Sequence, residues 1–178
     1  MAPIVNKDWG PILPHVSQSL YLYIFIAMPE LKEGDLAPAF SAKDQEVKTV
    51  TLEEYRGKKV VLYFYPKDNT PGCTAEAFDL RDNYSRFQEE GYEILGVSAD
   101  SEKSHQNFIA KYQLPFRLIS DPERKVLEAY GAWGEKKMYG KTYMGILRKT
   151  LVINEDGIVE KIIEKVKTKE HSQQIFSE

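Results

Sequence analysis

Apolar residues along this chain fall into short runs and helical stripes, separated by turns that contain glycine or proline. The run at 60–65 is continuously apolar, as expected for a central strand that is covered on both faces. From residue 73 to residue 87 the apolar positions recur at helical spacing, and Gly91 ends that segment. The remaining predicted elements are a strand pair up to about residue 50, a short helix from Thr51 that Gly57 stops, strands at 92–98 and 116–119, helices at 101–112 and 121–130, a β-hairpin at 151–166 and a last helix after His171.

This order of elements predicts an α/β fold with a mixed central sheet flanked by helices. The chain has 178 residues, of which 42% are hydrophobic and 29% charged, an ordinary composition for one globular domain with a real core. No linker or repeat interrupts the pattern, so we predict a single domain over residues 29–178.

The first 28 residues differ from the rest, and we expect them to be a poorly structured N-terminal extension. Their apolar run at 20–27 is too short to span a bilayer as a helix. The stretch before it lacks the basic character of a secretory signal, although a weak signal or anchor stays open as an alternative. Because Met28 immediately precedes the first predicted domain residues, we expect Met28 to be the natural initiator and residues 1–27 an upstream extension.

Charge and cysteine content exclude several functional classes. The net charge of −3 argues against a general nucleic-acid or membrane-surface binder. The chain has one cysteine, so it forms no intrachain disulfide and lacks a Cys-x-x-Cys dithiol, and we expect a cytoplasmic location. The histidines His15, His105 and His171 are far apart in the sequence, and we expect neither a metal site nor a cofactor.

The single cysteine, Cys73, stands in an unusual setting. A strand-like run ends at Pro66, a short polar loop follows, and Thr70-Pro71-Gly72 leads into the first turn of a predicted helix. Backbone N–H groups and the helix dipole at that position favour an anion, so a thiolate is stabilised there. A lone cysteine is more often a small buried apolar residue, but the flanking residues favour a reactive thiol.

The spacing Pro-x-x-x-Thr-x-x-Cys, with Pro66, Thr70 and Cys73 in register, resembles the peroxidatic site of the peroxiredoxins. The longer motif Thr-Pro-Gly-Cys-Thr-x-Glu is similar to that of one branch of the family, the bacterioferritin comigratory protein (peroxiredoxin Q-like) branch. Further segments in family order extend the resemblance over residues 30–178. The resemblance implies a thioredoxin fold with peroxiredoxin additions and a thiol-dependent peroxidase acting on hydrogen peroxide and organic hydroperoxides.

Peroxide reduction needs a thiolate nucleophile and hydrogen-bond donors aimed at the peroxide oxygens. We expect Cys73 to be the nucleophile and the Thr70 hydroxyl to reach both the thiolate and the peroxide, the alternative for Thr70 being a simple helix N-cap. The backbone N–H groups of Gly72 and Cys73 are candidate donors to the peroxide. Pro66 would shield the thiolate from water, or merely end the strand.

A cation is also expected beside the thiolate. The resemblance points to Arg148, in the sequence Gly-Ile-x-Arg-x-Thr before a strand, where a surface arginine is the plain alternative. Arg81 is a weaker candidate, because it lies two turns down the helix from Cys73. Glu76 lies on the same helical face as Cys73, and we expect it to orient Arg148.

The chain departs from the family at Phe78, where many members of this branch carry a resolving cysteine. A sulfenic acid on Cys73 therefore has no internal thiol to condense with, and the mechanism must be one-cysteine. The expected reductant is external, either a thioredoxin-like protein or a small thiol such as glutathione, and the expected assembly is a monomer or weak homodimer. Two alternatives stay open: a peroxide-sensing redox relay that forms mixed disulfides with partners, and a binding module with a vestigial site.

Overall fold

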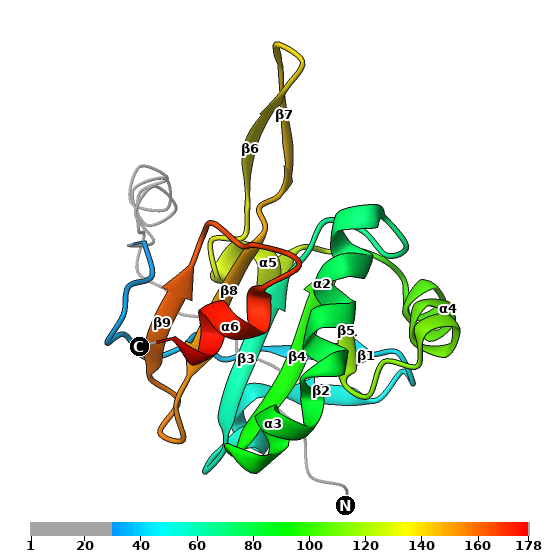
Figure 1. Ribbon diagram of the computed structural model, residues 1–178. Coiled ribbons are helices and arrows are strands. Elements are labelled where there is room, and N and C mark those ends of the chain that lie inside the picture. Colours follow the sequence, from blue (N-terminus) through cyan, green and yellow to red (C-terminus); the bar gives the residue numbers. More distant parts are fainter. Residues whose placement is uncertain (1–29, 178) are drawn as a thin grey trace, which may run out of the picture. The chain divides into compact units, whose positions relative to one another are not determined.

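The computed structural model describes residues 30–177 (Figure 1). The predictions for the extension at 1–28, its apolar run at 20–27 and the initiator Met28 fall outside the described residues. Within residues 30–177, no helix combines the length and the apolar character needed to cross a membrane.

A mixed central sheet organises the fold, as predicted. Within the described residues it has seven strands in the order β2-β1-β5-β4-β3-β8-β9. Strand β3 runs parallel to β4 and antiparallel to β8, so it is paired on both sides. The strand bounds are β1 Ser41–Asp44, β2 Thr49–Thr51, β3 Lys59–Phe64, β4 Tyr92–Ser98, β5 Arg117–Ser120, β8 Lys149–Ile153 and β9 Val159–Ile163.

Side chains of β3 supply both halves of the core, because successive residues of a strand point to opposite faces. Val60, Leu62 and Phe64 pack in one hydrophobic cluster, while Val61 and Tyr63 pack in the other. The second cluster also contains Cys73, Ala77 and Leu80 of helix α2 (Pro71–Asp82), which lies across that face of the sheet (Figure 1). The continuous apolar run at 60–65 therefore belongs to a strand covered on both faces, as the sequence predicted.

The helix predicted from 73 to 87 is two helices in the structure. Helix α2 ends at Asp82, and α3 (Tyr84–Glu89) begins after Asn83, which leaves helical geometry with φ −102° and ψ 9°. The side-chain amide of Asn83 donates to the carbonyl of Asp79 at 2.8 Å. Side-chain bonds of this kind compete with the backbone pattern of a helix, which the apolar spacing alone does not reveal.

The helix predicted to start at Asp121 starts later, as α5 (Lys125–Ala129). Arg124, with φ 62°, adopts the left-handed conformation just before it and separates it from Pro122. The carboxylate of Asp121 still accepts from the backbone N–H of Leu127 at 2.8 Å. It therefore satisfies one N–H group in the first turn of α5, although Asp121 lies four residues before that helix. The other helices are η1 Leu52–Tyr55, α4 Glu102–Tyr112 and α6 His171–Phe176.

A second, two-stranded antiparallel sheet was not predicted. Strands β6 (Trp133–Met138) and β7 (Lys141–Ile146) form what we call the β6–β7 ribbon, which projects from the body of the domain (Figure 1). Its two-residue turn has φ 50° at Tyr139 and φ 75° at Gly140, the signs of a type I′ hairpin turn. Lysines and glycines along both strands hide the period-2 pattern that would have indicated strands.

Candidate active site

Cys73 lies in the first turn of α2, directly after the loop that follows β3. Thr70 occupies the N-cap position with extended backbone angles, and Pro71 is the first helical residue, where its missing N–H costs no hydrogen bond. The first N–H groups of a helix have no intrahelical acceptor, so those of Gly72 and Cys73 are available to a ligand. Cys73 itself is a buried residue, only 2% exposed.

Arg148 reaches Cys73 from a distant part of the sequence because of strand pairing. Strand β8 runs antiparallel to β3 with Lys149 opposite Phe64, which brings Arg148 to the end of β3 where the loop to α2 begins. Its guanidinium Nη2 donates to Cys73 Sγ at 3.3 Å, and Nη1 donates to the carboxylate of Glu76. Arg148 therefore places a fixed positive charge in contact with the sulfur.

Gly72 leaves room for this arginine. A Cβ atom built on Gly72 would lie 3.3 Å from Arg148 Nη2, which is tighter than most contacts of that type. A glycine at this position therefore lets the guanidinium approach the helix terminus and the sulfur together.

Glu76 is fully buried one helical turn after Cys73. Burial raises its pKa to about 7, although the adjacent Arg148 guanidinium acts in the opposite direction. One of its oxygens, Oε1, has no hydrogen-bond partner among the described residues and faces Nε2 of His171 at 3.6 Å. The carboxyl group is thus held between Arg148 on one side and His171 on the other.

His171 and Thr150 complete this buried cluster, and sequence reasoning missed them. Thr150 Oγ1 lies 2.9 Å from His171 Nε2, and burial lowers the pKa of His171 to about 4, so the ring is neutral at neutral pH. His171 begins α6, and the neighbouring backbone N–H of Ser172 donates to Asp79 of α2 at 2.5 Å. The last helix is therefore docked on the helix that carries Cys73.

Thr70 turns its hydroxyl proton away from the sulfur. The hydroxyl donates to the carbonyl of Lys67 at 2.8 Å, and the side chain makes no capping hydrogen bond to the helix. Thr70 is thus the N-cap by position, without the side-chain bond of the simple N-cap alternative. Its oxygen keeps lone pairs that can accept from a substrate O–H. Pro66, half-buried, follows the end of β3.

The loop between β3 and α2 is fixed by a buried network around Asp68, which sequence reasoning also missed. Its carboxylate accepts from the hydroxyls of Tyr65 and Ser104, both at 2.7 Å, and contacts His105 Nδ1 at 2.8 Å. The backbone N–H of Asp68 donates to Asp100 at 2.9 Å. Burial alone would raise the pKa of Asp68, but hydrogen bonds from His105, Tyr65 and Ser104 hold it below its ordinary value.

Comparisons with known proteins identify the family of this chain. A family model described as "AhpC/TSA family" matches residues 34–162. The chain belongs to this family. It is 49% identical over 138 residues to Peroxiredoxin Bcp of Bacillus subtilis, covering 78% of this chain and 88% of that protein. Peroxiredoxin Bcp of Escherichia coli is 44% identical over 144 residues, with coverages of 81% and 92%.

A solved structure of Xanthomonas campestris Bacterioferritin Comigratory Protein superposes with a TM-score of 0.75. The two are 37% identical, and the match covers 82% of this chain and 92% of that one. The predicted α/β thioredoxin fold and the predicted family are therefore confirmed. The chain is a peroxiredoxin of the Bcp and peroxiredoxin Q type, a thiol-dependent peroxidase.

The two remaining predicted positions lie away from the sulfur of this peroxiredoxin. Arg81 pairs with Asp82 and donates to the carbonyl of Tyr112 at 2.9 Å, so its guanidinium is engaged at the interface with α4. Phe78 packs edge-on against Tyr112 with ring centroids 5.0 Å apart. At the position of the family's resolving cysteine, Phe78 therefore packs α2 against α4.

Proposed function

We propose that this peroxiredoxin reduces hydrogen peroxide and organic hydroperoxides by a one-cysteine mechanism centred on Cys73. The observation that carries the proposal is the contact of Arg148 Nη2 with the sulfur of the chain's single cysteine, at 3.3 Å. A permanent cation beside a sulfur at a helix N-terminus favours the thiolate, the form that attacks an O–O bond.

In the first step the Cys73 thiolate attacks one peroxide oxygen. The O–O bond breaks, the sulfur becomes a sulfenic acid, and the other oxygen leaves as hydroxide or alkoxide, which takes a proton from water. Negative charge develops on that leaving oxygen. The Arg148 guanidinium and the free N–H groups of Gly72 and Cys73 are the donors that would stabilise it.

The neighbouring residues position the peroxide and its cation. The Thr70 hydroxyl would accept a hydrogen bond from the peroxide O–H, because its own proton is already engaged in a hydrogen bond to the backbone carbonyl of Lys67. Pro66 would keep water from the thiolate. Glu76 acts on Arg148 and not on the substrate, since its carboxylate accepts from the guanidinium within the buried interior.

Turnover requires a thiol from outside the chain, because one cysteine cannot form an internal disulfide. Peroxiredoxins of this family accept electrons from a thioredoxin-type reductant, and we propose a thioredoxin-like protein, or a small thiol such as glutathione, as the donor here. The functional unit is the domain at 29–178, acting in the cytoplasm as a monomer or weak homodimer.

A redox relay that passes oxidation to partner proteins is the second candidate, because the missing resolving cysteine prolongs the sulfenic acid. A steady-state peroxidase assay, run first with thioredoxin and its reductase and then with glutathione, separates the two. We expect many turnovers per enzyme with at least one reductant, and none in Cys73→Ser. Stoichiometric oxidation without turnover under all reductants would favour the relay, and activity in Cys73→Ser would overturn the mechanism.

A further inference from the structure

The β6–β7 ribbon exposes apolar side chains on both of its faces. Met138 is 54% exposed, Tyr143 40% and Met144 56%, and Tyr139 at the tip is 96% exposed. Cross-strand pairing places Met144 beside Glu135 on one face and Tyr143 beside Lys136 on the other. A two-stranded ribbon alone is marginally stable in water, and so much exposed apolar surface indicates a binding surface.

The tip of the ribbon presents an aromatic ring at an energetic cost. Tyr139 takes the first position of a type I′ turn with φ 50°, a left-handed conformation that asparagine, aspartate or glycine adopt more easily. Because nothing within the described fold packs on a ring that is 96% exposed, local packing does not account for the tyrosine.

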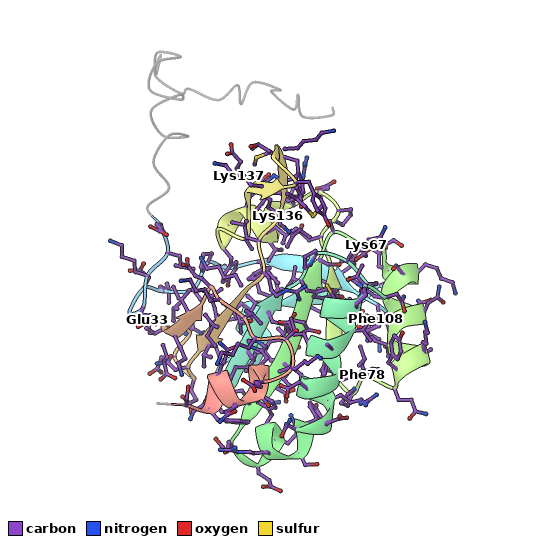
Figure 2. The ribbon with its side chains drawn as sticks, turned by 45° about the horizontal axis from the view of Figure 1, so that its top comes forward. Glu33, Lys67, Phe78, Phe108, Lys136 and Lys137 are labelled. Carbon is purple, nitrogen blue, oxygen red and sulfur yellow. The ribbon has the colours of Figure 1, made fainter. Side chains whose placement is uncertain are left out.

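The ribbon is also basic, in a chain whose net charge is −3. It carries Lys136, Lys137 and Lys141 against one acidic residue, Glu135. Lys67, on the loop that leads to Cys73, lies at the same end of the molecule as Lys136 and Lys137 (Figure 2). An acidic partner surface would be attracted to this end and oriented by it.

The ribbon is continuous with the active site. Strand β7 ends at Ile146, and two residues later Arg148 contacts the sulfur of Cys73. A protein bound along the ribbon would therefore lie beside the mouth of the site, where an external thiol is needed.

We propose that the β6–β7 ribbon is the docking surface for a protein thiol that reduces oxidised Cys73, with acidic and apolar residues around its thiol. This inference rests on the proposed one-cysteine function. The partner thiolate attacks the sulfur of the sulfenic acid, a mixed disulfide forms as the S–O bond breaks, and the oxygen leaves as hydroxide, which takes a proton from water. A second partner thiol then attacks the mixed disulfide and frees the Cys73 thiolate, so two partner thiols supply both electrons.

The test compares a protein reductant with a small one. Two double variants, Met138→Ser/Met144→Ser and Lys136→Glu/Lys137→Glu, are assayed with thioredoxin kept reduced by its reductase and NADPH, and then with dithiothreitol. Matched controls are Leu36→Ser/Val47→Ser, which are exposed apolar residues elsewhere, and Lys103→Glu/Lys111→Glu on α4. We expect each ribbon variant to raise the KM for thioredoxin about tenfold, with dithiothreitol turnover and single-turnover peroxide consumption unchanged.

Several outcomes would overturn the inference. These are an unchanged thioredoxin KM in the ribbon variants, an equal rise in the controls, a parallel loss with dithiothreitol, or a wild type that turns over with dithiothreitol but not with thioredoxin. Loss of a wild-type homodimer in the ribbon variants, measured by sedimentation, would assign the ribbon to a second copy instead. Failure of the proposed function has a separate signature, because the wild type would then consume no peroxide in a single turnover.

Discussion

At the scale of single residues, Gly72 controls how closely the guanidinium approaches the helix that carries the sulfur. An added Cβ would meet Arg148 Nη2 at 3.3 Å, so the arginine would have to move by a few tenths of an ångström. Alanine at this position carries no backbone strain and is the better helix former.

We therefore expect Gly72→Ala to slow peroxide attack roughly tenfold, because small misplacements of catalytic groups are costly, while the melting temperature stays constant or rises. Stopped-flow peroxide kinetics on the reduced protein and thermal unfolding would measure the two effects. An unchanged rate constant would show that the contact with Arg148 does not matter for the reaction.

Glu76 and His171 make opposite contributions to the dependence of stability on pH. The pKa of Glu76 rises on folding to about 7, so its contribution is full below about 4.5 and is lost as pH rises through about 7. The pKa of His171 falls on folding to about 4, so its contribution is full above about 6.5 and is lost as pH falls through about 4. Each contribution to the free energy of unfolding amounts to roughly 3 kcal/mol. Between about pH 4.5 and 6.5 the contribution of Glu76 falls with pH while that of His171 rises, so the two changes largely cancel.

Single substitutions should expose each contribution. In Glu76→Gln the free energy of unfolding should rise with pH between about 4 and 6.5, whereas in His171→Gln it should fall between about 4.5 and 7. Urea denaturation across this pH range measures both slopes. Parallel profiles for the two variants and the wild type would contradict the assignment.

The family resemblance pointed to Arg148, and pairing of β8 with β3 brings its guanidinium to the sulfur of Cys73. No comparable signal existed for His171 or Thr150. Their contacts depend on how α6 docks against α2 and β8, which is a matter of tertiary packing over nearly a hundred residues of sequence. The sequence likewise gave no sign that His105 and His171 are each buried in a polar cluster.

At the scale of elements, apolar periodicity predicted the central strands and the positions of most helices. It did not detect the end of α2 or the late start of α5. The side-chain amide of Asn83 sets the first boundary, and the left-handed backbone conformation of Arg124 sets the second. It missed the β6–β7 ribbon altogether, since a ribbon exposed on both faces has no buried side to give a period-2 pattern.

The loop between β3 and α2 is held by the buried side chain of Asp68. Asp68→Asn would place amide hydrogens against the hydroxyls of Tyr65 and Ser104 and the ring of His105, which are its present partners. We expect a loss of about 2 kcal/mol in the free energy of unfolding at pH 7.

This loss should shrink in acid. Because the pKa of Asp68 is lowered on folding, its stabilising contribution is present above its unfolded pKa and disappears as pH falls through the folded pKa. Chemical denaturation at pH 7 and near pH 3 would measure the difference, with Asp82→Asn, at an exposed position, as the control. An equal loss at both pH values would contradict the role of the Asp68 charge.

At the scale of the whole molecule, a peroxiredoxin with one cysteine has no internal protection for its sulfenic acid. Dimedone should trap Cys73 after peroxide treatment, and sulfinic acid should accumulate when thiol is scarce.

Phe78→Cys restores the family spacing. Five residues along a helix separate the Cα atoms by about 7.5 Å along the axis alone, which already exceeds the reach of a disulfide, so the first turns of α2 must unwind before one can form.

We expect Phe78→Cys to reduce over-oxidation, at some cost in stability from the lost packing of Phe78 on Tyr112. Intact mass spectrometry after graded peroxide measures the sulfinic acid, and Phe78→Ser is the matched control without a thiol. Equal sulfinic acid in the parent and in Phe78→Cys would mean that α2 does not open in this protein.

The burial of Cys73 has a kinetic consequence for every reductant. A cysteine residue that is 2% exposed admits a peroxide more readily than a bulky thiol, so reduction of the sulfenic acid must wait for the site to open. Above a sufficient thiol concentration the reduction rate should therefore reach a ceiling set by the opening motion, identical for dithiothreitol and for a protein thiol. Rapid-mixing reduction of pre-oxidised protein would reveal that common ceiling, whereas rates that keep rising linearly with each thiol would show that no such gate exists.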